Sequence, residues 1–246
     1  MELTVVGGTG LIGAQLVREL TAAGHSAVPA ARSTGVDLLT GRGLDEALEG
    51  AEVMVDLSNS PTLDEASSEF FRTSTNNLLA AGKRAGVRHQ VVLSIVGADQ
   101  VPEVAYYRAK TLQEELALRG PTPCSIVRAT QFFEFVDAVL SWTSDASTVR
   151  LPTTRLQPIA AADVVDALVQ VATGEPLRGT RDVAGPDVFP LDELGRTTLA
   201  AQQDERTVTT DDRAGLFAAA SRDALIAGPG AQIAPTHYRD WIRQAG

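Results

Sequence analysis

The sequence has one cysteine, Cys124, among 246 residues, and it has neither a basic leader nor a long apolar run. A single cysteine cannot form a disulfide within the chain, which is typical of proteins from a reducing compartment. The first residues lack the positive charge that begins a signal peptide, and no apolar run reaches the roughly 18 residues that a membrane span requires. We therefore expect a soluble, cytoplasmic protein with no membrane partner.

Basic residues are few and scattered. The chain has 21 Lys and Arg against 31 Asp and Glu, which gives a formal net charge of −10. A chain of this charge without a basic patch repels a phosphate backbone, so we expect no nucleic acid partner. His25, His89 and His237 are far apart and lack the spacing of metal ligands, so no metal site is predicted. The sequence also lacks the Gly-x-Ser-x-Gly motif of hydrolases.

Short apolar runs alternate with segments of helical periodicity along most of the chain. The pattern predicts strands over 3–6, 25–31, 53–57, 90–95 and 125–128, and helices over 11–23, 44–48, 64–85, 106–118, 132–140 and 162–171. It also places Ile159 in a short strand. Strands that alternate with helices imply βαβ units, and so an α/β fold with a Rossmann-like, doubly wound, mostly parallel sheet.

Beyond about residue 174 this alternation weakens. The pattern there predicts a strand over 180–184, a helix over 191–202, a strand over 206–210 and a final helix near Tyr238. We therefore expect a Rossmann-like core over 1–174 and a small C-terminal lobe over 175–246 that is integral to the same domain. The pattern does not decide between a monomer and a homodimer.

The turn after the first expected strand is rich in glycine. It reads Gly7-Gly8-Thr9-Gly10-Leu11-Ile12-Gly13, in which Gly8, Gly10 and Gly13 satisfy G-x-G-x-x-G. In a dinucleotide site one glycine permits a sharp turn, one lets the backbone approach the pyrophosphate, and one lets the helix pack closely on the strand. The N-terminus of that helix faces the phosphates. Because the motif falls at a strand-to-helix turn, these seven residues predict a dinucleotide site; the alternative is a glycine turn without a ligand.

The end of the second expected strand indicates which dinucleotide is bound. Proteins selective for NAD usually carry an Asp or Glu there, bound to the ribose 2′-hydroxyl. This chain instead has Arg32, Ser33 and Thr34, a guanidinium with two hydroxyls suited to a 2′-phosphate. The sequence therefore favours NADP(H) over NAD(H). The alternative is that Arg32 is an ordinary solvated charge.

Ser94, Tyr106 and Lys110 form a candidate catalytic group. Tyr106 and Lys110 are four residues apart in an expected helix and so share one face. A nearby ammonium stabilises a phenolate and lowers the pKa of the tyrosine, which suits Tyr106 to donate a proton to a carbonyl during hydride transfer. Ser94 ends an expected strand, where open α/β sheets place ligands, and its hydroxyl would orient the same carbonyl. Two alternatives stay open: Tyr107 as the donor, and an ordinary amphipathic helix start with exposed polar residues.

The glycine turn, Ser94 and Tyr106-Tyr107-Arg108-Ala109-Lys110 together resemble the short-chain dehydrogenase/reductase superfamily. Thr130-Gln131-Phe132-Phe133, and Gln157-Pro158-Ile159 before Asp163-Val164, are similar to its atypical branch of NmrA-like NAD(P)H-binding proteins. The resemblance covers essentially the whole chain, and it implies that Lys110 also holds the nicotinamide ribose. It further implies that the cofactor is contacted by Ser58, Asn59 and Ser60, with Asp37 at the adenine amine.

Gln131, Phe132 and Phe133 follow the fifth expected strand, at the edge where a substrate would lie. Aromatic rings there are suited to stacking on a flat substrate or on the nicotinamide. The alternative is a helix start that packs into the core. Substrate identity and reaction direction depend on loops and on the C-terminal lobe, which the sequence pattern does not resolve.

The sequence therefore predicts an NADP-dependent oxidoreductase that reduces a ketone, quinone or enone of a small organic substrate. The alternative from another class is a regulator that senses NADPH and NADP and binds a protein without turnover, because some members of the atypical branch lose the tyrosine and act as redox sensors. A nucleotide-sugar epimerase or dehydratase is a weaker hypothesis. Such relatives usually have a C-terminal lobe larger than the roughly seventy residues left here.

Overall fold

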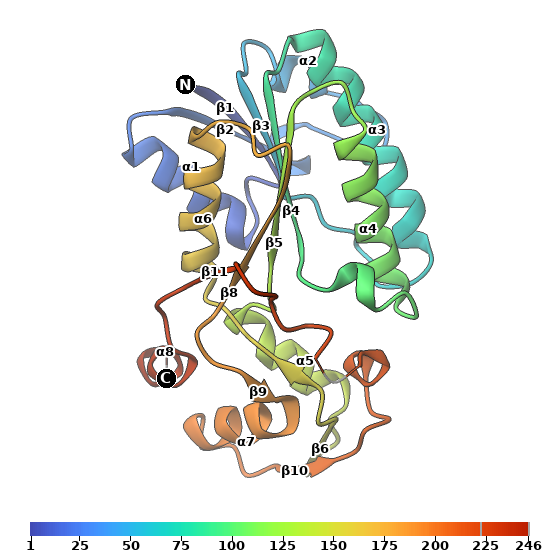
Figure 1. Ribbon diagram of the computed structural model, residues 1–246, viewed down its shortest axis with the longest axis vertical. Helices are drawn as coiled ribbons and strands as arrows, with labels where there is room; N and C mark the ends of the chain where they lie inside the picture. The colour runs from blue at the N-terminus through green and yellow to red at the C-terminus, as the bar shows by residue number, and fades with distance from the viewer. Residues whose placement is uncertain (222, 246) are drawn as a thin grey trace. The chain divides into compact units, whose positions relative to one another are not determined.

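A central sheet organises the computed structural model, which describes residues 1–221 and 223–245 (Figure 1). Within these residues the strand order is β11-β8-β5-β4-β3-β1-β2. The strands span Glu2–Val6 (β1), Ser26–Ala30 (β2), Val53–Asp56 (β3), His89–Ile95 (β4), Cys124–Ala129 (β5), Gly179–Ala184 (β8) and Gln232–Ile233 (β11). β1 is parallel to both β2 and β3, β3 to β4, and β8 to β11. The expected Rossmann-like, mostly parallel α/β fold is confirmed.

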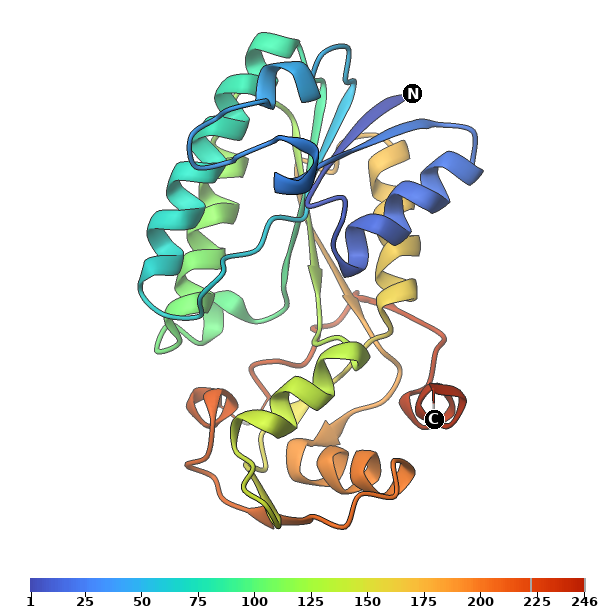
Figure 2. The same cartoon turned by 180° about the vertical axis from the view of Figure 1, so that it is seen from behind.

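Helices cover both faces of this sheet. α3 (Ala66–Ala85) and α4 (Ala105–Leu118) lie on one face, and α1 (Leu11–Ala22) and α6 (Ala161–Thr173) lie on the other (Figure 1, and from behind in Figure 2). Strands enclosed in this way are apolar on both sides, and all four residues of β3 are buried. An acid at the end of such a strand, Asp56, therefore needs partners inside the protein.

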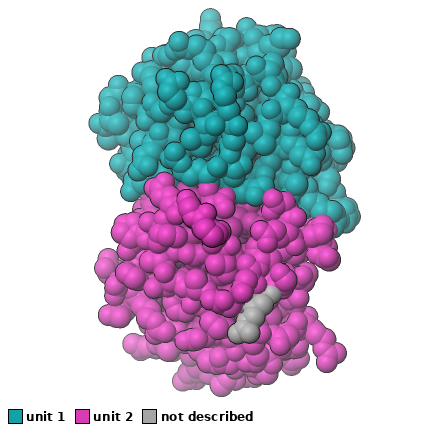
Figure 3. Space-filling view, viewed as in Figure 1, with its two compact units in different colours: residues 1–94, 105–128, 164–181 teal, residues 95–104, 129–163, 182–246 magenta. Residues whose placement is uncertain are grey.

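The chain forms two compact units (Figure 3). Unit 1 comprises residues 1–94, 105–128 and 164–181, and unit 2 comprises 95–104, 129–163 and 182–246. The sequence pattern predicted one boundary, at residue 174, which placed the segments after β4 and β5 in the core. Those two segments belong to unit 2, because the chain leaves unit 1 near the carboxyl ends of these strands and later returns.

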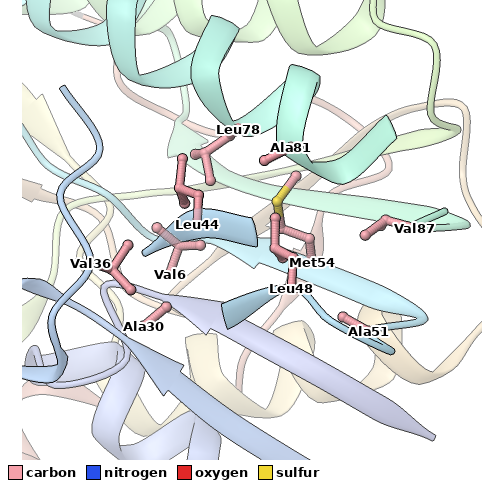
Figure 4. Close-up of a cluster of buried hydrophobic side chains, with 10 residues drawn as sticks. All are labelled: Val6, Ala30, Val36, Leu44, Leu48, Ala51, Met54, Leu78, Ala81 and Val87. Carbon is pink, nitrogen blue, oxygen red and sulfur yellow. The ribbon is translucent and has the colours of Figure 1, made fainter. Parts of the chain in front are cut away.

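The core of unit 1 includes a cluster that packs beneath α3 and the short helix α2 (Leu44–Ala47) (Figure 4). Its buried side chains are Val6, Ala30, Val36, Leu44, Leu48, Ala51, Met54, Leu78, Ala81 and Val87. A leucine buried as fully as Leu48 or Leu78 stabilises the fold by about 1.5–3 kcal/mol. The cluster therefore holds β1 and β3, the two strands whose carboxyl ends carry most of the candidate site.

Unit 2 is built from short elements. β6 (Thr148–Leu151) is parallel to β10 (Thr207–Thr210), and β7 (Arg155–Leu156) is antiparallel to β9 (Phe189–Pro190). The helices of this unit are α5 (Val136–Trp142), α7 (Leu191–Ala201) and α8 (Tyr238–Ala245). The ring of Tyr238 packs on those of Phe133, Phe189 and Trp241, with centroids 5.0 to 6.0 Å apart. These contacts join the segment after β5 to the last helix.

The segment after β5 differs from the sequence expectation. Phe132 is extended and pairs with Ile159 in an isolated parallel bridge, so Ile159 lies in a bridge rather than in a strand. A 3-10 turn over Phe133–Phe135 follows, and the helix expected over 132–140 begins only at Val136. The other expected helices and strands are confirmed within two residues at their ends.

None of the helices in the described part of the chain is both long and apolar enough to cross a membrane.

Candidate active site

The candidate site begins where the order of strands reverses. β1 lies between β2 and β3, so the chain turns to one side of β1 after the first helix and to the other side afterwards. Open α/β sheets bind ligands beside the carboxyl ends of the strands at such a point. Gly7 follows β1 there, and the backbone amide of Leu57, after β3, donates a hydrogen bond of 3.0 Å to the carbonyl oxygen of Val6.

Three glycines of the turn are required by the fold itself. Gly7 has a φ of +77°, and a Cβ there would lie 2.8 Å from the carbonyl oxygen of Leu57. A Cβ on Gly13 would lie 2.2 Å from the carbonyl oxygen of Gly7, and one on Gly8 would lie 2.7 Å from Pro29. Such distances are too short for any side chain, so α1 and β2 approach the turn as closely as they do because these positions are glycine.

Gly10 has a different role. A Cβ there would meet only the carbonyl oxygen of Gly7, at 3.3 Å, so the fold alone does not require glycine at this position. Gly10 caps α1 with extended backbone and no side-chain hydrogen bond, and it is exposed together with Thr9 and Leu11. The first turn of a helix has amide groups without partners and a partial positive charge. This arrangement fits the close approach of a pyrophosphate.

The residues that bear on the choice of dinucleotide follow β2. Arg32 and Ser33 are exposed in a 3-10 turn, and the Ser33 hydroxyl lies 3.5 Å from that of Thr9. The carboxylate of Asp37 accepts hydrogen bonds from the backbone amides of Leu39 and Thr40, which hold its pKa below the ordinary value. Asp37 thus shapes its own loop, and its contact with an adenine amine stays a prediction.

Three polar residues follow β3, on the other side of β1. Ser58 is buried, and its hydroxyl has no hydrogen-bond partner among the described residues. The side-chain oxygen of Asn59 accepts a hydrogen bond from the Tyr106 hydroxyl, and the Ser60 hydroxyl accepts one from the backbone amide of Thr62. Of the three, Ser58 has the free hydroxyl that a ribose contact needs.

Tyr106 and Lys110 begin α4, and both lie against the ring of Phe71. The Lys110 ammonium is 4.8 Å from the centroid of that ring, and the Tyr106 ring is 6.1 Å from it. Burial raises the pKa of Tyr106 to about 12. The expectation that this pKa is lowered is therefore wrong, because burial disfavours the charged phenolate.

Lys110 is buried and has two partners. Its ammonium donates a hydrogen bond of 2.8 Å to the carbonyl oxygen of Leu93 and another to the side-chain oxygen of Gln113. Burial lowers the pKa of Lys110 to about 8, while the carboxylates of Asp56 and Glu114 act in the opposite direction. The bond to Leu93 brings Lys110 to the end of β4, one residue before Ser94.

Ser94 is 3% exposed, and its hydroxyl has no hydrogen-bond partner among the described residues. Buried hydroxyls are normally paired, so the Ser94 hydroxyl is available to a ligand atom. Ser58 and Ser94, at the ends of neighbouring strands β3 and β4, both have this property. Together with the open face at Gly10, they fit a bound dinucleotide.

Comparison with known proteins agrees with this geometry. The sequence pattern of the NAD dependent epimerase/dehydratase family matches residues 3–125, half of the chain. The protein belongs to the NAD dependent epimerase/dehydratase family. The expected resemblance to short-chain dehydrogenases/reductases of the NmrA-like branch is confirmed.

Two curated relatives share similar stretches with this family member. The photosystem II assembly factor Ycf39 of Synechocystis is 26% identical over 149 residues, covering 54% of this chain and 46% of the relative. A (4-alkanoyl-5-oxo-2,5-dihydrofuran-3-yl)methyl phosphate reductase of Streptomyces griseus is 28% identical over 153 residues, covering 57% and 50%. The chain thus aligns with about half the length of these two relatives.

A solved structure of MoeE5 in complex with UDP-glucuronic acid and NAD matches with a TM-score of 0.75 at 18% identity, and it covers 100% of both chains. At this identity the likeness concerns the fold alone.

In unit 2 the expected substrate residues differ in their surroundings. Both side-chain atoms of Gln131 that form hydrogen bonds are buried without a partner among the described residues. Phe133 is 2% exposed and packs 5.0 Å from Tyr238 and 5.3 Å from Trp241, as a core side chain does. Phe132 is half-buried in its bridge to Ile159. Gln131 is therefore the one of these three residues with unpaired polar side-chain atoms, and its contact with a substrate stays a prediction.

Asp56 and Gln113 were not among the site residues predicted from the sequence. Asp56 is fully buried, and its carboxylate accepts hydrogen bonds of 2.9 Å from the Ser58 backbone amide and from the side-chain amide of Gln113. A signal was present, because an acid at the end of an apolar strand must find donors inside the protein. The identity of the donor was not accessible, since Gln113 lies 57 residues further along the chain.

Proposed function

We propose that the protein is an NADP-dependent oxidoreductase that reduces a carbonyl or conjugated carbonyl of a small organic molecule. The observation that carries the proposal is the pair of unpartnered hydroxyls, Ser58 and Ser94, beside the hydrogen-bonded Tyr106 and Lys110 in one compact unit. A dinucleotide with two ribose groups, together with a substrate that has a reacting carbonyl, would supply hydrogen-bond partners for these four side chains. Its pyrophosphate would lie at Gly10 and the N-terminus of α1.

Each residue then has a defined part. The bound dinucleotide supplies the hydride to the substrate carbon. Tyr106 has a pKa of about 12, so it is protonated at neutral pH and donates its hydroxyl proton to the substrate oxygen. Ser94 donates a hydrogen bond to that oxygen, and Lys110 holds the ribose next to the nicotinamide.

The preference for NADPH over NADH rests on Arg32 and Ser33. Both are exposed at the end of β2, where an NAD-selective protein carries an acid. A guanidinium binds a 2′-phosphate through two charge-assisted hydrogen bonds, which a 2′-hydroxyl cannot match. The similarity to a reductase of Streptomyces griseus supports reduction as the reaction. We also propose that the protein acts in the cytoplasm, where its one cysteine, the buried Cys124, stays reduced.

A second candidate is a regulator that binds NADPH and a protein partner without turnover. The similarity to photosystem II assembly factor Ycf39 favours it, because that name describes assembly rather than catalysis. The two candidates differ in chemistry, not in cofactor binding. Incubation with NADPH deuterated at the transferred position and a panel of ketones, quinones and enones distinguishes them. Deuterium in a reduced product supports the oxidoreductase, and binding of NADPH with no product from any member of the panel favours the regulator.

A further inference from the structure

A chain of buried hydrogen bonds links β3 to Lys110 inside unit 1. The Asp56 carboxylate accepts from the Gln113 side-chain amide at 2.9 Å, and the Gln113 side-chain oxygen accepts from the Lys110 ammonium. Asp56 and Gln113 are both 0% exposed, and Lys110 is 3% exposed. Gln113 thus lies between a buried anion and a buried cation that do not touch.

The other oxygen of Asp56 accepts the backbone amide of Ser58, which fixes the turn after β3. The same carboxylate therefore holds two parts of the candidate cofactor site: the Ser58 turn directly, and Lys110 through Gln113. Loss of the Gln113 bridge would uncouple Lys110 from Asp56 and leave the bond between Asp56 and the Ser58 turn in place.

Two carboxylates face Lys110, and they are not equivalent. Glu114, on its own helix, forms a two-point ion pair with Arg128 of β5, at 2.9 and 2.6 Å, which offsets its charge. Asp56, on β3, has no ion pair among the described residues. The remaining neighbours, the Phe71 ring of α3 and the Leu93 carbonyl of β4, carry no net charge. Of the two carboxylates that act on Lys110, Asp56 is therefore the one whose charge no ion pair offsets among the described residues.

We propose that Gln113 is a positioning residue: it transmits the charge of Asp56 to Lys110 and fixes the direction of the ammonium for dinucleotide binding. The inference rests on the proposed role of Lys110 in holding the dinucleotide. Gln113 suits this task because its amide accepts from the cation on one side and donates to the anion on the other. An apolar side chain of the same size leaves both ions without this partner, and a buried ammonium then loses its proton more readily.

The sequence offers a direct readout. Lys83 and Lys110 are the only lysines in the chain, and Lys83 is exposed in the last turn of α3. Protein labelled with ¹³C at the lysine ε-carbon therefore gives two NMR signals, and a Lys83→Arg variant assigns them. A pH titration of these signals follows the protonation of Lys110, and the exposed Lys83 serves as a control within the same molecule. Neither cofactor nor turnover is needed.

Three variants test the proposal. In Gln113→Met, Lys110 is expected to titrate about one pH unit or more below the wild type, because the bridge to Asp56 is gone. In Gln113→Glu, it is expected to titrate above the wild type, because a carboxylate moves next to the ammonium. The matched control is Gln90→Met in β4: Gln90 is equally buried, but its amide has no hydrogen-bond partner among the described residues. In Gln90→Met, the pH at the midpoint of the Lys110 titration is expected to equal that of the wild type.

A merely structural Gln113 would lower stability and leave the titration of Lys110 where it is in every variant that folds, and that result would overturn the proposal. Opposite shifts in the two Gln113 variants support it, as does the expected shift in one of them if the other does not fold. NADPH affinity, measured on the same samples, separates this inference from the proposed function. Absence of NADPH binding by the wild type removes the function, whereas an unmoved Lys110 titration removes only the role of Gln113.

Discussion

The hydroxyl of Tyr106 donates a hydrogen bond to the side-chain oxygen of Asn59, which joins the start of α4 to the loop after β3. The sequence placed both residues at the same site but assigned them to different tasks, one to proton donation and the other to the cofactor. Their contact shows that the hydroxyl proton of Tyr106 has a defined direction in the protein alone. A substrate oxygen that takes this proton has to replace Asn59 as the acceptor.

Tyr106→Phe is the first test of the catalytic role. We expect turnover to fall by about 10²- to 10⁴-fold, the usual contribution of a general acid, with the dissociation constant for NADPH unchanged. The matched control is Tyr107→Phe, which removes a hydroxyl from the neighbouring, buried ring. Equal turnover by Tyr106→Phe and wild type would contradict the role of Tyr106. A loss confined to Tyr107→Phe would transfer it to that residue.

The pH dependence of NADPH binding should follow Lys110. Burial lowers its pKa to about 8, so the ammonium form is present below that pH and is lost as the pH rises through it. Affinity is therefore expected to fall above about pH 8. Tyr106 has a pKa of about 12 and contributes no change in this range. Titrations at several pH values in wild type and Tyr106→Phe should show the same fall, and its disappearance in the variant would mean that the tyrosine controls binding.

Gly10→Ala and Gly13→Ala should separate cofactor binding from folding. The methyl group at position 10 meets only the Gly7 carbonyl, at 3.3 Å, and fills the surface assigned to the pyrophosphate. We expect nearly wild-type thermal stability and at least about tenfold weaker NADPH binding. At position 13 the methyl group would lie 2.2 Å from the Gly7 carbonyl oxygen, and we expect a loss of about 1–3 kcal/mol or more in the free energy of unfolding. Unchanged affinity in a folded Gly10→Ala would place the phosphates elsewhere.

Arg32→Ala tests the choice of cofactor. Without the guanidinium, NADPH affinity should fall by about tenfold while NADH affinity stays the same, because only NADPH carries the 2′-phosphate. Arg42→Ala is a close control, since both arginines are exposed and both act on the Asp37 carboxylate. If Arg42→Ala had the larger effect on NADPH, or if Arg32→Ala weakened both nucleotides equally, the assignment to Arg32 would be wrong.

The fold was predictable because its signals are local. The apolar runs of β1, β3, β4 and β5 and the periodicity of the helices between them show directly in the sequence, and the glycine turn marks the first βα connection. The short strands of unit 2 carry no such signal. β7 and β9 have two residues each, and β6 pairs with β10 across more than fifty residues, so only tertiary structure defines them.

The sequence indicated which residues of α4 share one face, but not the hydrogen bonds that they form. A spacing of four correctly placed Tyr106 and Lys110 on one face of a helix, beside Phe71. It did not reveal that the ammonium donates its hydrogen bonds to Leu93 and Gln113, or that burial raises the pKa of Tyr106. The orientation of the buried ammonium depends on Leu93 of β4 and, through Gln113, on Asp56 of β3. The periodicity of one helix does not predict such contacts with other elements.

Titration of the purified protein with NADPH and with NADH tests the central claim most directly. The account predicts saturable NADPH binding with a dissociation constant on the order of micromolar, tighter than that of NADH. It also predicts that Arg32→Ala reduces the difference between the two nucleotides. Absence of binding for both nucleotides to the folded protein would contradict the account: the glycine turn would then be only structural, and the oxidoreductase and regulator proposals would fail together.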